Sequence, residues 1–132
     1  MGAEQRTKNI YIGAPACFAL EMACSHIRDA FVSDDDPGGI YVVGSCLERQ
    51  DWRDIDVRLI MSDEAFERLF PNASLLNAAW EHDPRWVLMV TTIAQWMSSQ
   101  TGLPIDFQFQ PATFANERHL KARQPVGFRY VR

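Results

Sequence analysis

The chain has 132 residues, of which 47% are hydrophobic and 23% charged, and its formal net charge is −4. This length predicts one domain with a single core, and the composition is that of a globular rather than a disordered chain. No apolar run approaches the roughly 20 residues of a membrane-spanning helix, and the first residues lack the apolar core of a secretion signal. We therefore expect a cytoplasmic protein with no membrane partner.

The first predicted element is a helix from about Pro15 to about Phe31. Proline is favoured in the first helical turn, and apolar side chains recur at spacings of three and four residues, which defines one buried stripe. This stripe consists of Cys17, Leu20, Cys24, Ile27 and Phe31. The acidic segment 33–39, with its proline and two glycines, predicts a tight loop after the helix.

Two strands follow. The run Ile40–Val43 is short and apolar, as expected for an interior strand, and it leads into Gly44 and Ser45, a turn suited to holding a phosphate. The second strand is predicted from Asp54 to Met61. Its side chains alternate between the two faces of a sheet, so Asp54 and Asp56 share one face. The opposite, core-facing side receives Ile55, Val57, Leu59 and Met61.

The second half of the chain predicts two helices and a third strand. Ser62 is suited to cap a short helix that Pro71 ends, and Asp83 with Pro84 is suited to start a longer helix that ends near Gly102. The strand 105–110 then repeats the apolar alternation, with Asp106 on the polar face. Segment 111–132 carries no clear structural pattern.

Charge is unevenly distributed along the chain. Residues 1–109 carry a net charge of −8, whereas residues 110–132 carry +4. We favour a solvated tail or one that folds back onto the acidic body; contact with nucleic acid or polyphosphate is the less favoured alternative. The three cysteines are odd in number and form no C-x-x-C pair, which indicates neither a disulfide framework nor a zinc site.

The three aspartates predict a metal site if the second and third strands are neighbours. Asp54, Asp56 and Asp106 would then converge. Like charges gathered on one surface repel each other, and such an arrangement rarely persists unless cations neutralise it. Magnesium prefers such hard oxygen ligands and completes its shell with water and substrate phosphates. The alternative for each aspartate taken singly is an ordinary solvated side chain.

The ordered set of these residues resembles the nucleotidyltransferase superfamily that includes polymerase β. The resemblance covers about residues 40–110 and rests on Val43-Gly44-Ser45, the pair Asp54-Ile55-Asp56-Val57 after eight intervening residues, and Ile105-Asp106-Phe107. It implies an α+β fold with a small mixed sheet and helices packed on one face. Small family members often carry arginine directly after Gly-Ser, whereas Cys46 and Leu47 stand here.

The resemblance also implies roles for the individual residues. Gly44 and Ser45 would contact the triphosphate, and Arg49 and Arg53 are candidates for further phosphate contacts, with surface exposure as the alternative. The aspartates would hold two divalent ions, Mg²⁺ or Mn²⁺, about 4 Å apart. Asp106 would also help to activate the attacking hydroxyl.

We therefore expect a metal-dependent enzyme that moves a nucleoside monophosphate from a nucleoside triphosphate such as ATP to an acceptor hydroxyl. The chain has no room for a helical acceptor domain, so the acceptor is expected on another molecule, by analogy with small members paired with HEPN-type partner proteins. The first alternative is a non-catalytic module of the same fold that binds a nucleotide or a partner. The second is a nucleic-acid-binding accessory protein that uses the basic tail.

Overall fold

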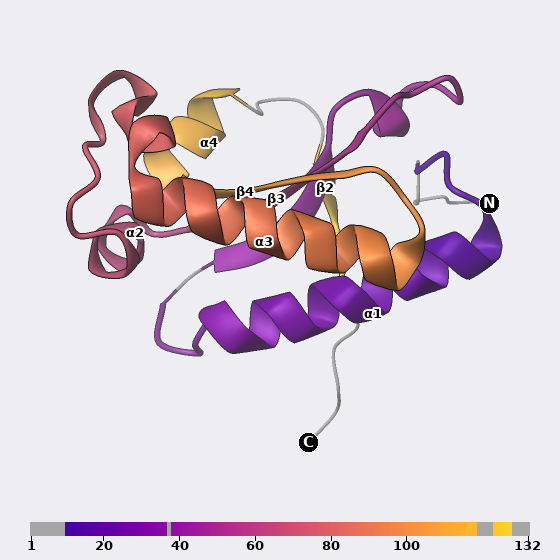
Figure 1. Cartoon of the computed structure of the whole chain (residues 1–132), viewed down its shortest axis with the longest axis horizontal. Helices are drawn as coiled ribbons and strands as arrows, with labels where there is room; N and C mark the ends of the chain where they lie inside the picture. The colour runs from indigo at the N-terminus through magenta and orange to yellow at the C-terminus, as the bar shows by residue number, and fades with distance from the viewer. Residues whose placement is uncertain (1–9, 37, 119–122, 128–132) are drawn as a thin grey trace.

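The structure is a computed structural model that describes residues 10–36, 38–118 and 123–127. Helices and strands alternate in a mixed α+β arrangement, as the sequence predicts (Figure 1). In chain order the elements are α1 (Ala14–Phe31), β2 (Gly38–Val43), the 3₁₀ helix η1 (Ser45–Leu47), β3 (Ile55–Met61), α2 (Asp63–Leu69), the 3₁₀ segment η2 (Leu76–His82), α3 (Pro84–Thr101), β4 (Ile105–Pro111), α4 (Ala112–Arg118) and β5 (Gln124–Pro125).

The helix boundaries follow the local chemistry of the sequence. The hydroxyl of Ser62 accepts a hydrogen bond from the amide of Ala65 at 3.0 Å, which caps α2. The carboxylate of Asp83 accepts one from the amide of Trp86 at 3.1 Å, which caps α3. At the other end of α3, Gly102 adopts φ 73°, the left-handed conformation that commonly ends helices. The predicted starts of both helices are thus confirmed.

The four strands described form one sheet in the order β4-β3-β2-β5. β2 and β3 are antiparallel, whereas β3 and β4 are parallel. A parallel pair needs a long crossover connection, which α2, η2 and α3 supply here. The second and third predicted strands are therefore neighbours, which is the condition that the sequence analysis set for convergence of the acids.

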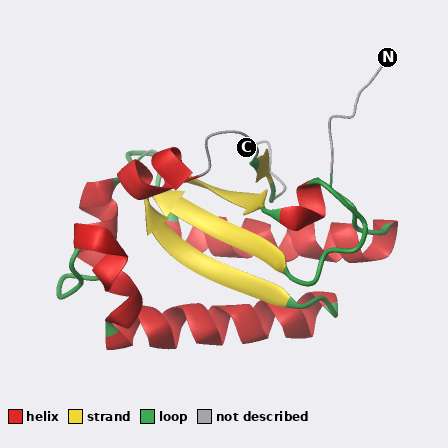
Figure 2. Ribbon diagram, turned by 90° about the horizontal axis from the view of Figure 1, so that it is seen from above, coloured by secondary structure: helices red, strands yellow, loops and turns green. Residues whose placement is uncertain are grey.

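One face of the sheet packs against α1 and α3. Both views show these two helices running alongside the sheet (Figures 1 and 2), and they also contact each other. Ile55, Val57 and Leu59 are fully buried on this face, as their alternation predicts. Of the predicted stripe on α3, Trp86, Val90 and Met97 are buried and Ile93 is partly buried; the core is therefore the one that the apolar periodicity indicates.

The tail contains structure that the sequence did not predict. Residues 112–118 form α4, and residues 124–125 form β5, which pairs antiparallel with β2. At Gly127 the chain is bound to α1, because the guanidinium of Arg28 donates a hydrogen bond to the Gly127 carbonyl at 2.8 Å and the Gly127 amide donates one to Glu21. The described part of the tail therefore folds back onto the body. Lys121, Arg129 and Arg132 lie outside the described residues.

In the part of the chain that the structure describes, no helix is both long enough and apolar enough to cross a membrane.

Leu59→Ala tests the core. Leu59 is fully buried in the central strand β3, so we expect the substitution to lower the free energy of unfolding by about 2–5 kcal/mol. The matched control is Leu88→Ala, because Leu88 on α3 is 68% exposed and its loss should change stability by less than about 0.5 kcal/mol. Urea denaturation followed by tryptophan fluorescence measures both; equal effects would contradict the assignment of the core face.

Candidate active site

Asp56 and Asp106 are brought together by the register of two parallel strands. Each is the second residue of its strand, and they are direct partners in the pairing of β3 with β4. The amide of Ile55 donates a hydrogen bond to the carbonyl of Pro104 at 2.9 Å, so the pairing of the two strands starts at this point. As a consequence β3 begins at Ile55, and Asp54 lies in the bend before it rather than within the strand as predicted.

Asp56 is affected electrostatically by both of the other acids. Desolvation by burial raises the pKa of Asp56 above its ordinary value; the positive charge of Arg58 lowers it, and the negative charges of Asp106 and Asp54 raise it further. Asp54 is therefore near enough to Asp56 for its charge to be felt, although it stands outside the strand. The polar face at the start of β3 and β4 thus brings Asp56 beside Asp106, whereas Asp54 lies in the exposed bend before it.

Gly44 makes room for the Asp56 carboxylate. It directly follows β2 and has φ 83° and ψ −157°, a conformation that is accessible essentially to glycine alone. A Cβ atom at this position would overlap with Oδ2 of Asp56. Val43, the residue before it, is the strand partner of Asp56. The Gly-Ser turn predicted to approach a ligand therefore also seats one of the predicted metal-binding carboxylates.

The loop between β2 and β3 is held by the segment that precedes α1. The amide of Tyr11 donates to the carbonyl of Cys46 at 2.9 Å, and the indole of Trp52 donates to the carbonyl of Tyr11 at 2.7 Å. These bonds fix η1, which begins at Ser45. Burial and the charge of Asp56 raise the pKa of the Cys46 thiol to about 11, which disfavours the thiolate, the nucleophilic form of cysteine.

The two arginines predicted to contact phosphate lie on the surface of this loop. The Nε of Arg49 is 3.2 Å from Oδ1 of Asp51, and both side chains are mostly exposed. Arg53 is exposed directly before Asp54. Within the described residues, no hydrogen bond or ion pair joins either arginine to the three predicted metal ligands. The role of the two arginines as phosphate ligands stays a prediction.

Arg58 is the residue of this site that sequence reasoning missed. It follows Asp56 by two positions on β3 and therefore lies on the same face of the sheet. Its Nη2 atom is 3.5 Å from Oδ2 of Asp106 and 3.9 Å from Oδ1 of Asp56. The signal was present in the sequence, since a cation two residues after an acid on a strand must share the polar face with it.

The residues fit a divalent cation in their chemistry, because carboxylate oxygens are the ligands that Mg²⁺ and Mn²⁺ prefer. The space that the missing Cβ of Gly44 leaves is taken by the Asp56 carboxylate itself. Their arrangement brings together fewer possible metal ligands than the three carboxylates that the sequence predicts. In residues 10–36, 38–118 and 123–127, no group of three His, Cys, Asp or Glu side chains is placed to hold a metal ion together.

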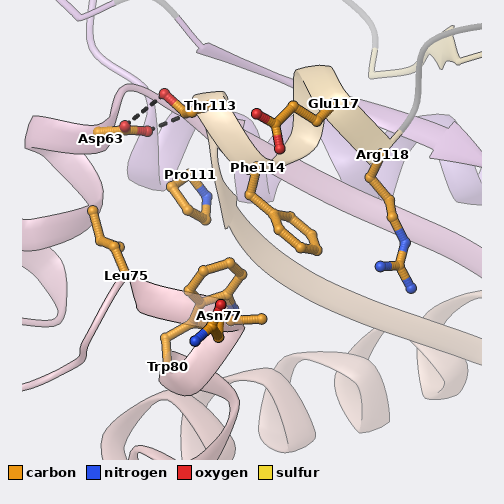
Figure 3. A pocket seen from close by; sticks show the side chains of 10 residues that line it. Asp63, Leu75, Asn77, Trp80, Pro111, Thr113, Phe114, Glu117 and Arg118 are labelled. Atoms are coloured by element: carbon orange, nitrogen blue, oxygen red, sulfur yellow. Dashed lines mark hydrogen bonds between the residues drawn. The ribbon is translucent and has the colours of Figure 1, made fainter.

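Two hollows in the described part of the chain lie away from these acids. One has a volume of about 500 Å³ and is lined by residues near the end of β4 and by α4, among them Trp80, Pro111, Phe114 and Arg118 (Figure 3). The hydrogen bonds between Asp63 and Thr113 close one side of it. A second hollow of about 230 Å³ is lined by Gly39, Tyr41, Ile60 and neighbouring residues of α4. Asp54, Asp56 and Asp106 line neither of these two hollows.

No protein-family model matches the chain, and no curated protein or solved structure matches it either.

Gly44→Ala is expected to destabilise the protein by at least about 2 kcal/mol, because it combines backbone strain with overlap against the Asp56 carboxylate. Gly102→Ala is the matched control. Gly102 also has a positive φ, but nothing lies within 4 Å of its missing Cβ, so only strain of about 1 kcal/mol is expected. Chemical denaturation of both variants gives the comparison; equal costs would show that the overlap with Asp56 is relieved without penalty.

Asp56→Asn is expected to raise the melting temperature in EDTA at neutral pH by about 2–5 °C. The raised pKa of Asp56 means that the folded state binds the proton more tightly than the unfolded chain, so ionisation of this carboxyl at neutral pH costs stability. The neutral amide removes that cost. The gain should vanish as the pH falls through the folded-state pKa, because the wild-type carboxyl is then protonated as well. Thermal scans across pH measure this, and a gain that persists in acid would contradict it.

Proposed function

We propose that this protein has a nucleotidyltransferase-like fold and transfers a nucleoside monophosphate from a nucleoside triphosphate to an acceptor hydroxyl, with the help of a divalent cation. The observation that carries the proposal is the register of β3 and β4, which sets Asp56 beside Asp106 at the end of the sheet where Gly44 and Ser45 follow β2. Asp54 adds its charge to the same place.

The order of elements supports the proposed fold. The strand that precedes Gly44, β2, runs antiparallel to β3, which carries Asp56. The strand with Asp106, β4, lies parallel to β3 on its other side. α1 precedes this unit and α3 connects its last two strands, both over the core face. The motif residues that the resemblance names therefore fall at one end of one sheet.

The proposed reaction is a displacement at the α-phosphorus of the triphosphate. A bond forms between the acceptor hydroxyl oxygen and this phosphorus, and the bond to the bridging oxygen of the β-phosphate breaks, so pyrophosphate leaves with the electron pair. We assign the hydroxyl proton to the carboxylate of Asp106, whose side chain is 47% exposed and can be reached from solvent. Proton acceptance by a positioned carboxylate typically contributes about 10²–10⁴-fold to a rate.

The other residues bind and orient the nucleotide. Asp54 and Asp56 would hold the divalent cation, Mg²⁺ or Mn²⁺, which supplies positive charge to the phosphate oxygens as negative charge develops on them. The backbone of Gly44 and the hydroxyl of Ser45 would approach the phosphates, and Arg49 and Arg53, in the loop that follows, would join them. The acceptor would come from another molecule, such as a partner protein.

A second candidate function is a non-catalytic module that binds a nucleotide or a partner. It is favoured by the ion pairs of Arg58, which partly neutralise the carboxylates, and by the lack of a three-ligand metal arrangement among the described residues. Binding without turnover would need no general base, so this candidate predicts that nucleotide affinity survives the loss of Asp106.

The test is transfer of label from α-³²P nucleoside triphosphates to candidate acceptors with Mg²⁺ or Mn²⁺, followed together with pyrophosphate release. We expect Asp54→Asn and Asp56→Asn each to lower the rate by more than about 100-fold, because charge stabilisation at phosphorus carries most of such catalysis. Asp35→Asn, in the exposed turn after α1, is the matched control and should leave the rate unchanged.

Transfer that continues in either variant of the acid pair would rule out the mechanism. Nucleotide binding by the wild-type protein without any release of pyrophosphate, unaffected by Asp106→Asn, would establish the binding module instead.

A further inference from the structure

The hollow of about 230 Å³ lies at the end of the sheet opposite to the candidate active site. It is lined by Gly38 at the start of β2, by Met61 at the end of β3 and by residues of α4. In the pairing of β2 with β3, Gly38 is the partner of Met61, whereas Val43 is the partner of Asp56. The hollow and the candidate active site are therefore about five residues apart along β3, roughly 17 Å.

The guanidinium of Arg123 is held against one wall of this hollow. Its central carbon lies 4.8 Å from the centre of the Tyr41 ring, a cation–π contact. Its Nη2 donates a hydrogen bond to Oδ1 of Asn116 at 3.1 Å. The Tyr41 ring in turn lies over Gly39, where an added Cβ atom would be 2.9 Å from the tyrosine oxygen. The guanidinium is thus positioned from two sides, by β2 and by α4.

The charge of Arg123 has no acidic partner within the described residues. Its Nη1 is buried and makes no hydrogen bond there. No Asp or Glu lines the hollow, and none of the described carboxylates forms an ion pair with Arg123. A charged donor that is withdrawn from water without a partner is costly. The arrangement therefore favours an anion beside Nη1.

Two further side chains of the hollow have hydrogen atoms to donate. Oδ1 of Asn116 faces Arg123, so the amide nitrogen of Asn116 is left as a donor. Oγ of Ser62 accepts a hydrogen bond from the Ala65 amide, which leaves the hydroxyl hydrogen available. The apolar part of the lining consists of Ile60, Met61 and Ala112. An occupant with an anionic end and an apolar body matches this lining.

Size and charge narrow the class of anion. The volume of about 230 Å³ is below the roughly 300–1,000 Å³ of sites for drug-sized ligands, so the occupant is smaller than these. One guanidinium balances one negative charge, which is the charge of a carboxylate, whereas a phosphate group carries about 1.5 to 2 at pH 7. The excess charge of a phosphate would be unfavourable in a protein whose net charge is already −4.

We propose that this hollow is a binding site for a small aliphatic monocarboxylate. The carboxylate pairs with Nη1 of Arg123, and the aliphatic chain lies against Ile60 and Met61. The proposal goes beyond the proposed function and does not depend on it, because the hollow includes none of the residues assigned to nucleotidyl transfer.

The experiment is a titration of the ¹⁵N-labelled full chain with butyrate, followed by the amide signals of Gly39 and Met61, which line the hollow. We expect saturable shifts of these signals. Butyramide has nearly the same shape without the charge and should bind at least about tenfold more weakly, because the charge-assisted bond to Arg123 is lost. Inorganic phosphate should also bind more weakly than butyrate.

Two arginine substitutions provide a matched pair. Arg123→Gln should weaken butyrate binding at least about tenfold, since it removes the ion pair. Arg118→Gln removes the same charge from an exposed position that lines the other hollow, and it should change the affinity by less than about twofold. Circular dichroism checks the folding of both variants, and the comparison of butyrate with butyramide needs no substitution at all.

Several results would overturn the proposal. They are the absence of saturable shifts with butyrate, equal affinity for butyrate and butyramide, and a folded Arg123→Gln variant that binds butyrate as the wild type does. A loss on Arg118→Gln as large as that on Arg123→Gln would show only a general effect of charge. Phosphate binding as tight as butyrate binding would contradict the assignment to a monocarboxylate.

Discussion

The candidate site depends on the parallel pairing of β3 with β4. A shift of one residue in this register would turn one of the two partner aspartates toward the core, because side chains alternate along a strand. The register is held from the apolar side, where Ile55, Val57 and Phe107 are buried under α1 and α3. The burial of one face of the sheet therefore sets the geometry of the charges on the other.

Stability and electrostatics oppose each other at the polar face. Burial of Asp56 against Gly44 raises the free energy of its charged form, and the neighbouring acids add to this cost. Arg58 offsets part of it, at the cost of desolvating its own guanidinium. Carboxylates gathered in this way are typical of functional sites, because a sheet selected for stability alone would separate them.

Most of the fold follows from local patterns in the sequence. The caps Ser62 and Asp83 and the apolar alternation of β3 predict their elements because each is decided by neighbours close in the chain. The same reasoning predicted the acids of the site but not Arg58, because the position of Arg58 depends on a carbonyl of the adjacent strand. It also left α4 and β5 unpredicted, since β5 is only two residues long and exists through its pairing with β2.

The short strand β5 has a consequence for the exposed side of the sheet. Without it, β2 would present a row of unpaired backbone groups in an apolar, β-prone segment, the type of edge at which chains pair with one another and aggregate. β5 covers that row over Tyr41 and Val42 and places Pro125, which has no amide hydrogen to donate, in the new outermost position. The hydrogen bonds that fasten Gly127 to α1 thus help to keep this edge of the sheet covered.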